Sequence, residues 1–179
     1  ADDKGNLYIL ERGGNALRVV DAKGKAVCEL WLRKGVPTTK DEVAGASFAQ
    51  IAEGTLLGVI HFPSNTSDYR GQGIKAGYYT LRYALILQDG NHLGVSPARD
   101  FLLICPIGED KDPSAQVKAD QLLKWSRAAS GSGHPSPWCL VLPSSDKELP
   151  KISKNEHRSE EHTSELQSPC NLVCRLLLE

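Results

Sequence analysis

The chain has 179 residues, of which 24% are charged and 40% hydrophobic, and its formal net charge at pH 7 is −1. This length suits a single domain with a complete hydrophobic core. Because the charge is nearly balanced and the lysines and arginines are scattered, we expect no nucleic-acid partner. No apolar run approaches the roughly 18 residues that a membrane span requires, so we expect no membrane span either.

Short strand-like segments separated by turn residues follow one another along the chain. In segment 25–32, apolar and polar residues alternate, which is typical of a half-buried strand. The preceding residues, Asp21-Ala22-Lys23-Gly24, are a turn signal, so 17–20 and 25–32 are predicted to pair as a hairpin. The other predicted strands are 7–11, 47–51, 55–62, 78–87, 100–105 and 137–142.

One helix is predicted, over about residues 113–130. Asp112 and Pro113 are a typical N-cap and first helical residue, and Gly131 stands where a helix would end. Small side chains recur between them at helical spacing, which suits packing against a sheet. The connections between the strands are too short for repeated βαβ crossovers. The predicted fold is therefore mainly β: an antiparallel β-sandwich of seven or eight short strands with one packed α-helix.

The end of the chain differs from the rest. Residues 158–168 and 172–179 resemble the in-frame translation of a sequencing-library adapter, in the correct order and with room for a barcode between them. A scar of this kind stands outside the fold. We therefore expect one β-sandwich domain over 1–147, a polar linker or truncated end over 148–157, and an artefact of a metagenomic assembly over 158–179.

Outside that segment, cysteine occurs at three widely spaced positions, which is no disulfide framework. Cys28 lies on the apolar side of its strand and is predicted to be a buried thiol. Cys105 and Cys139 both lie in strand-like runs and could meet. Whether they form a disulfide cannot be deduced from the sequence.

The segment 89–101 concentrates reactive side chains on a loop between two strands. His92, Ser96 and Asp100 supply the residue types of a hydrolase, which is the enzyme alternative for this chain. No serine, however, has the G-x-S-x-G setting that holds a nucleophile on a strained turn. We therefore expect no catalytic site and no cofactor.

A metal site is a second alternative. His61, His92 and His134 could supply ligands, but no H-x-x-x-H, H-x-H or C-x-x-C spacing occurs in residues 1–157. Such a site would have to assemble from separate loops, so we expect no metal.

The candidate binding residues are aromatic and cationic. Trp31 lies on the more polar side of its strand, and Tyr69 and Tyr78 flank a glycine-rich turn, so the three rings could form an aromatic surface. His92 and Arg99 on the 89–101 loop complete the set. A surface of this kind stacks on carbohydrate or packs against a protein, and these are the expected partners.

Two charged residues are predicted to be buried. Asp100 and Arg82 each share a side of a strand with apolar neighbours, and an unpaired buried charge is costly. Asp100 is therefore predicted to pair with Arg82 or to accept backbone N–H groups of a loop.

Three segments resemble bacterial sequences. The strand 74–83, IKAGYYTLRY, is similar to the A-G-x-Y-x-L strand of secreted bacterial β-sandwich domains, and 29–34 and 92–101 resemble segments of bacterial hypothetical proteins. The resemblance implies an exported β-sandwich, in the periplasm or outside the cell, and it transfers no catalytic residue. The expected function is that of a non-catalytic exported binding or structural module.

Overall fold

The computed structural model describes residues 9–13, 16–21, 23–68, 71–86 and 99–139. Its elements are β1 (Ile9–Gly13), β2 (Ala16–Val20), β3 (Ala26–Leu32), β4 (Leu56–Phe62), β5 (Thr66–Ser67), β6 (Gly73–Ile74), β7 (Gly77–Leu85), β8 (Asp100–Pro106), α1 (Ala119–Ser130) and β9 (Pro137–Cys139). Seven strands form one antiparallel sheet in the order β1-β2-β3-β4-β7-β8-β9, and the short β5 and β6 pair separately. The predicted mainly β fold with one packed helix is therefore confirmed, with two sheets of very unequal size.

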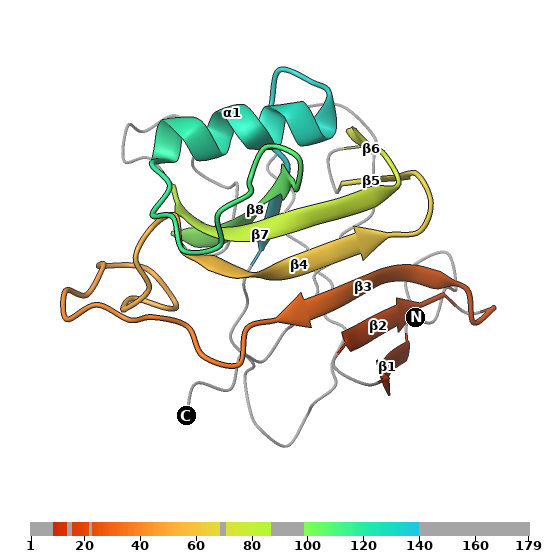
Figure 1. The fold of residues 1–179 in the computed structure, drawn as a ribbon, viewed down its shortest axis with the longest axis horizontal. Helices are drawn as coiled ribbons and strands as arrows, with labels where there is room; N and C mark the ends of the chain where they lie inside the picture. Colours follow the sequence, from red (N-terminus) through yellow and green to blue (C-terminus); the bar gives the residue numbers. More distant parts are fainter. Residues whose placement is uncertain (1–8, 14–15, 22, 69–70, 87–98, 140–179) are drawn as a thin grey trace, which may run out of the picture.

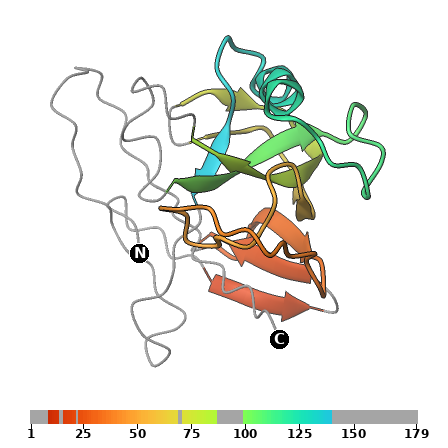
Figure 2. The same ribbon diagram turned by 90° about the vertical axis from the view of Figure 1, so that its left-hand side faces the viewer.

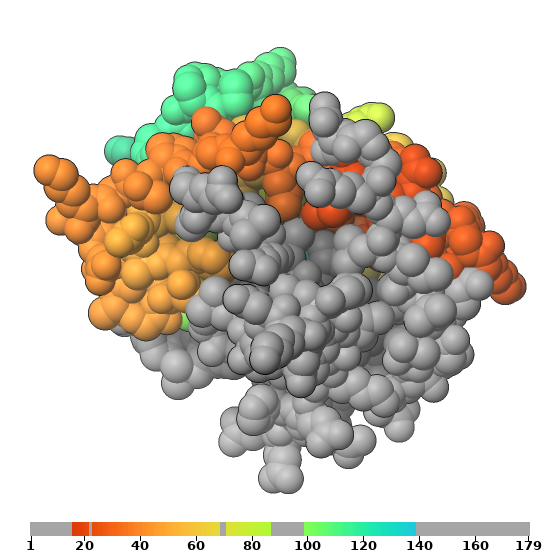
Figure 3. Space-filling view, turned by 90° about the horizontal axis from the view of Figure 1, so that it is seen from below, coloured from red at the N-terminus to blue at the C-terminus, as the bar shows by residue number. Residues whose placement is uncertain are grey.

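The large sheet is curled, and α1 lies across its outer face over β7 and β8 (Figure 1). In the view turned by 90°, the helix is seen along its axis above the sheet (Figure 2). The connection between β3 and β4, drawn in orange, projects at one side of the molecule (Figure 3). The fold thus has an outer face that α1 covers in part and an inner face that holds the main core.

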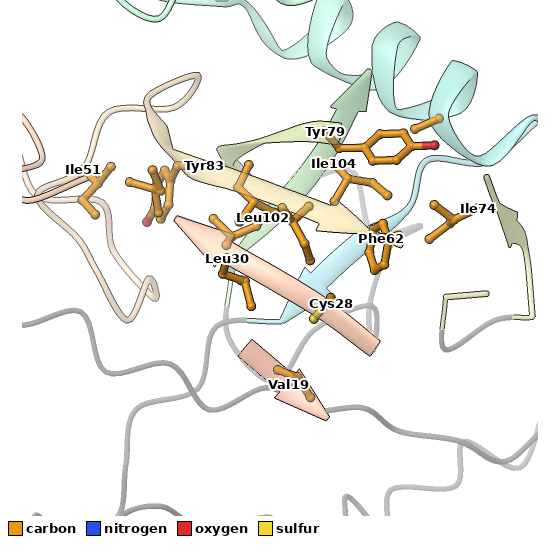
Figure 4. Close-up of a cluster of buried hydrophobic side chains, with 14 residues drawn as sticks. Val19, Cys28, Leu30, Ile51, Phe62, Ile74, Tyr79, Tyr83, Leu102 and Ile104 are labelled. Atoms are coloured by element: carbon orange, nitrogen blue, oxygen red, sulfur yellow. The ribbon is translucent and has the colours of Figure 1, made fainter. Parts of the chain in front are cut away.

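The inner face is almost entirely apolar. Leu30, Ile60, Leu81 and Ile104 come from four neighbouring strands and are at most 3% exposed. Ile51, from the connection between β3 and β4, and Ile74, from β6, close this core at opposite ends (Figure 4). Each such side chain stabilises the fold by about 1.5–3 kcal/mol through burial. A smaller apolar cluster on the outer face joins β8 to the helix through residues such as Leu103 and Leu122.

The hairpin of β2 and β3 forms as predicted. Gly24 has φ +77°, a left-handed conformation that glycine adopts without strain. The Asp21 carboxylate accepts the N–H groups of Lys23 and Lys25, which closes the turn.

The predicted strand at 47–51 is wrong. These residues form turns, with one isolated bridge between Ile51 and Thr38. The N–H groups of Ser47 and Phe48 donate to the carboxylate of Asp100 instead of to a neighbouring strand. The segment 47–51 is therefore held in place by the Asp100 side chain and not by hydrogen bonds to a neighbouring strand.

The predicted helix start at 113 is also wrong, because α1 begins at Ala119. Asp112 caps a local turn by accepting the N–H and the hydroxyl of Ser114. The buried Arg82 takes the carbonyls of Asp112 and Ala115, which an earlier helix would need for its own hydrogen bonds. The end is as predicted: Gly131 has φ 62° and donates its N–H to the carbonyl of Arg127.

Within the described ranges, no helix is both long enough and apolar enough to cross a membrane. The boundaries predicted at 147 and 157, and the adapter-like segment 158–179, lie outside the described residues.

Candidate functional site

Four side chains stand in register across the outer face of the sheet. Arg18 pairs with Glu29 between β2 and β3, Glu29 with His61 between β3 and β4, and His61 with Tyr78 between β4 and β7. Residues directly opposite on neighbouring strands have Cβ atoms about 4.5–5.5 Å apart and point to the same side. The antiparallel register therefore assembles one continuous row from four separate strands.

The charged half of the row is tightly connected. Glu29 Oε1 accepts hydrogen bonds from Arg18 Nη2 at 2.8 Å and from Arg18 Nε at 3.0 Å. The other carboxylate oxygen, Oε2, lies 3.1 Å from His61 Nδ1. The hydrogen bond to His61, followed by that to Arg18, holds the pKa of the Glu29 carboxyl below its usual range. Glu29 is thus an anion that fixes the ring of His61.

The other end of the row is aromatic and partly exposed to solvent. The ring of His61 stacks on that of Tyr78, with ring centroids 4.2 Å apart and an angle of 15° between the ring planes. The ring centroid of Trp31 lies 6.2 Å from that of Tyr78. Tyr78 is 50% exposed and Ile107 49%. These two are neighbours, because the N–H of Ile107 donates to the carbonyl of Tyr78. We call Trp31, His61, Tyr78 and Ile107 the aromatic patch, with Arg18 and Glu29 as its charged edge.

The structure brings together two of the predicted binding residues, Trp31 and Tyr78. Arg99 is elsewhere: its Nη1 donates to the carbonyl of Ala44, on the connection between β3 and β4. Tyr69 and His92 lie outside the described residues.

Of the three catalytic candidates, His92 and Ser96 also lie outside the described residues. Asp100 is fully buried. Its oxygens accept the N–H groups of Ser47 and Phe48 at 2.8 and 2.9 Å, and Oδ2 lies 3.1 Å from the hydroxyl of Tyr83. Together with burial, the Asp100 carboxylate raises the pKa of Tyr83, burial having the larger effect. These bonds give Asp100 a structural role in holding the β3–β4 connection.

The prediction that Asp100 accepts loop N–H groups is therefore confirmed, and its alternative, a pair with Arg82, is wrong. Arg82 lies opposite Leu103 and forms its ion pair with Asp110, at 2.6 Å between Nη2 and Oδ1. Since side chains alternate along a strand, Leu103 and Asp100 point to opposite faces of the sheet. The apolar neighbours of Asp100 on β8 and of Arg82 on β7 show that both residues are buried. They do not show whether the two side chains point to the same face of the sheet.

The metal candidates are separated. His61 stacks on Tyr78 on the outer face of β4, whereas His134 lies on the connection between α1 and β9. Among the described residues, no group of three or more His, Cys, Asp or Glu side chains could hold a metal ion.

The sequence left open whether a disulfide joins Cys105 and Cys139. It does not form, because Cys105 carries a free thiol. The backbone of Cys139 pairs with Phe101, four residues from Cys105 on β8. That offset is about 13 Å along a strand, beyond the roughly 7 Å over which a disulfide can form. Cys28 is buried, as predicted.

Comparison with protein-family models, with curated proteins and with solved structures finds no match to this chain. Its functional assignment therefore depends on the site geometry.

Glu29, Arg18 and Ile107 were missed as site residues by sequence reasoning. The alternation of segment 25–32 places Glu29 on the same side as Trp31, and that signal was available. The contact of Glu29 with His61 depends on the register of β3 against β4, and the 23-residue connection between these strands does not specify that register in the sequence.

Proposed function

We propose that the chain is a non-catalytic binding module, exported from a bacterial cell, that holds a protein partner on the aromatic patch. One observation carries the proposal: Tyr78 and Ile107, which are half-exposed, are joined by a backbone hydrogen bond, and the ring centroid of Tyr78 lies 6.2 Å from that of Trp31. Export is supported by the similarity of strand 74–83 to secreted bacterial domains.

The composition of the patch is that of a protein interface. Exposed apolar groups that adjoin one another and are edged by polar residues mark interaction sites. Tyr, Trp and Arg are the residue types that contribute most to the binding energy of such interfaces. The stack of His61 on Tyr78 and the bonds of Glu29 hold these rings before a partner arrives, which lowers the entropic cost of binding.

Carbohydrate is the second candidate partner. The observation that favours it is the row itself, in which the hydrogen-bonding groups of Arg18, Glu29 and His61 continue directly into the ring of Tyr78. A sugar needs both an apolar surface and nearby donors and acceptors.

Photo-crosslinking distinguishes the two. A photoreactive phenylalanine analogue is placed at Tyr78, at Ile107 or at the exposed Lys34 of the full chain, which is expressed in the organism that encodes it. We expect one and the same protein adduct from positions 78 and 107, none from position 34, and loss of the adduct when Trp31→Ala is added.

The same variants are then tested on a glycan array. Glycan binding that disappears in Tyr78→Ala, without any site-specific protein adduct, would establish the carbohydrate alternative. Absence of both signals from folded protein would overturn a binding role for the patch.

A further inference from the structure

A second feature of the outer face is a cavity between α1 and the sheet. Its volume is about 200 Å³, and it lies at the end of β7 opposite to Tyr78. Ala84, Phe101 and Leu103 form its floor on the sheet, and Leu122 closes it from the helix. The body of the cavity is therefore apolar, and it is distinct from the aromatic patch.

Cationic and hydrogen-bonding groups lie at the same cavity. Arg127, in the last turn of α1, lines it together with His134. The guanidinium of Arg127 has neither an ion pair nor a hydrogen bond to any described residue. Glu53 also lines the cavity, and its Oε1 accepts the N–H of Leu85 at 3.0 Å, so the lining carries one anion besides the cation Arg127. The cavity thus combines an apolar interior with an exposed cation, Arg127, whose guanidinium is bonded to no described residue.

Size limits what the interior can hold. An apolar cavity of about 150 Å³ in another protein takes up benzene, so this one has room for a single ring or a short aliphatic chain. A charged hydrogen bond between a guanidinium and a carboxylate is strong and geometrically specific. We propose that the cavity binds a small monocarboxylic acid, with its apolar body between Leu103 and Leu122 and its carboxylate paired with Arg127.

Calorimetric titration of the full chain tests this with three probes of equal chain length: hexanoate, hexan-1-ol and hexylammonium. We expect saturable binding with hexanoate tightest and hexylammonium weakest. Arg127→Gln should raise the Kd of hexanoate about tenfold and change that of hexan-1-ol by less than about twofold. Lys124→Gln, which removes another exposed cation of α1 that does not line the cavity, is the matched control and should change neither.

A filling variant tests the location. Ala119 is only partly buried and lines the cavity, so Ala119→Phe should keep the fold and weaken hexanoate and hexan-1-ol alike. Retention of the native melting temperature is checked first. Equal effects of Arg127→Gln and Lys124→Gln on hexanoate, undiminished binding in folded Ala119→Phe, or no saturable binding of hexanoate at about 10 mM would each overturn the proposal.

Discussion

Arg82 is completely buried, and each of its five guanidinium N–H groups has an acceptor. The Asp110 carboxylate takes two of them. The backbone carbonyls of Gly54, Asp112 and Ala115 take the other three. Because no donor remains for a ligand, this residue is structural, and it ties the segment between β8 and α1 to the sheet.

This bonding makes lysine a poor substitute at position 82. Lysine has three donors on a compact ammonium and cannot reach five acceptors in a planar arrangement. Lysine keeps the charge that pairs with Asp110 but leaves at least two of the five buried acceptors without a donor, so we expect Arg82→Lys to lower the free energy of unfolding by about 2–5 kcal/mol. Urea denaturation measures the change, with the exposed Arg33→Lys as control. Equal stability of the two variants would show that the network contributes little.

Asp100 gives a second prediction at this scale. Its removal leaves the N–H groups of Ser47 and Phe48 without their acceptor. Since each unsatisfied buried group costs about 1–3 kcal/mol, we expect Asp100→Ala to destabilise the protein by about 2–4 kcal/mol. Thermal unfolding checks this against the exposed Asp41→Ala. A melting temperature unchanged from the native protein would contradict the structural role.

Cys105 gives a prediction about pH. Burial, and to a lesser degree the Asp110 carboxylate, raise the pKa of its thiol from 9.0 to about 12. The neutral thiol therefore contributes stability that is fully present below about pH 9 and is lost as the pH rises toward 12. We expect iodoacetamide at pH 8 to spare Cys105 in the folded protein and to modify it in urea, as measured by peptide mass spectrometry. Modification at equal rates in both states would contradict this.

Among the helices and strands, the features that depend on neighbouring residues could be predicted from the sequence. The hairpin of β2 and β3 could be predicted from the Lys23-Gly24 turn and the alternation that follows it. The end of α1 could be predicted from Gly131. Its start could not, because Arg82 takes the carbonyls of Asp112 and Ala115 from positions 30 and 33 residues away in the sequence. A shared surface of Trp31 and Tyr78 was predicted from the sequence, but the place of His61 between Glu29 and Tyr78 was not, since it depends on strand register.

Gly54 tests how closely the segment before α1 packs on the sheet. It has φ +89°, and a Cβ atom there would overlap the backbone of Val117. A left-handed conformation alone costs a non-glycine residue about 1–2 kcal/mol, and the overlap adds to it, so we expect Gly54→Ala to lose more than about 2 kcal/mol. Chemical denaturation beside Gly35→Ala, where a Cβ meets open space, measures the difference. If both substitutions were neutral, the segment could not be packed as closely as described.

At the scale of the whole molecule, the adapter-like resemblance of residues 158–179 leads to a truncation experiment. The resemblance implies that this segment was never selected with the domain, and such a segment should add nothing to its core. We expect the chain ended after Pro150 to unfold with the same cooperativity and denaturant dependence as the full chain, since the slope of that dependence reports the surface exposed on unfolding. Loss of the folded state would show that the removed residues belong to the fold.

Strand β7 contributes one residue to each feature, Tyr78 to the aromatic patch and Ala84 to the floor of the cavity. Tyr78 and Ala84 lie on the same side of it, six residues apart, which is about 20 Å of extended chain. Between them, Thr80 and Arg82 are both bonded to Asp110, so this stretch of backbone is held rigidly. The strand consequently keeps the two features at a fixed separation. A partner bound at the patch would lie at a constant distance from a ligand in the cavity. The two could then contact a third molecule together without a conformational change.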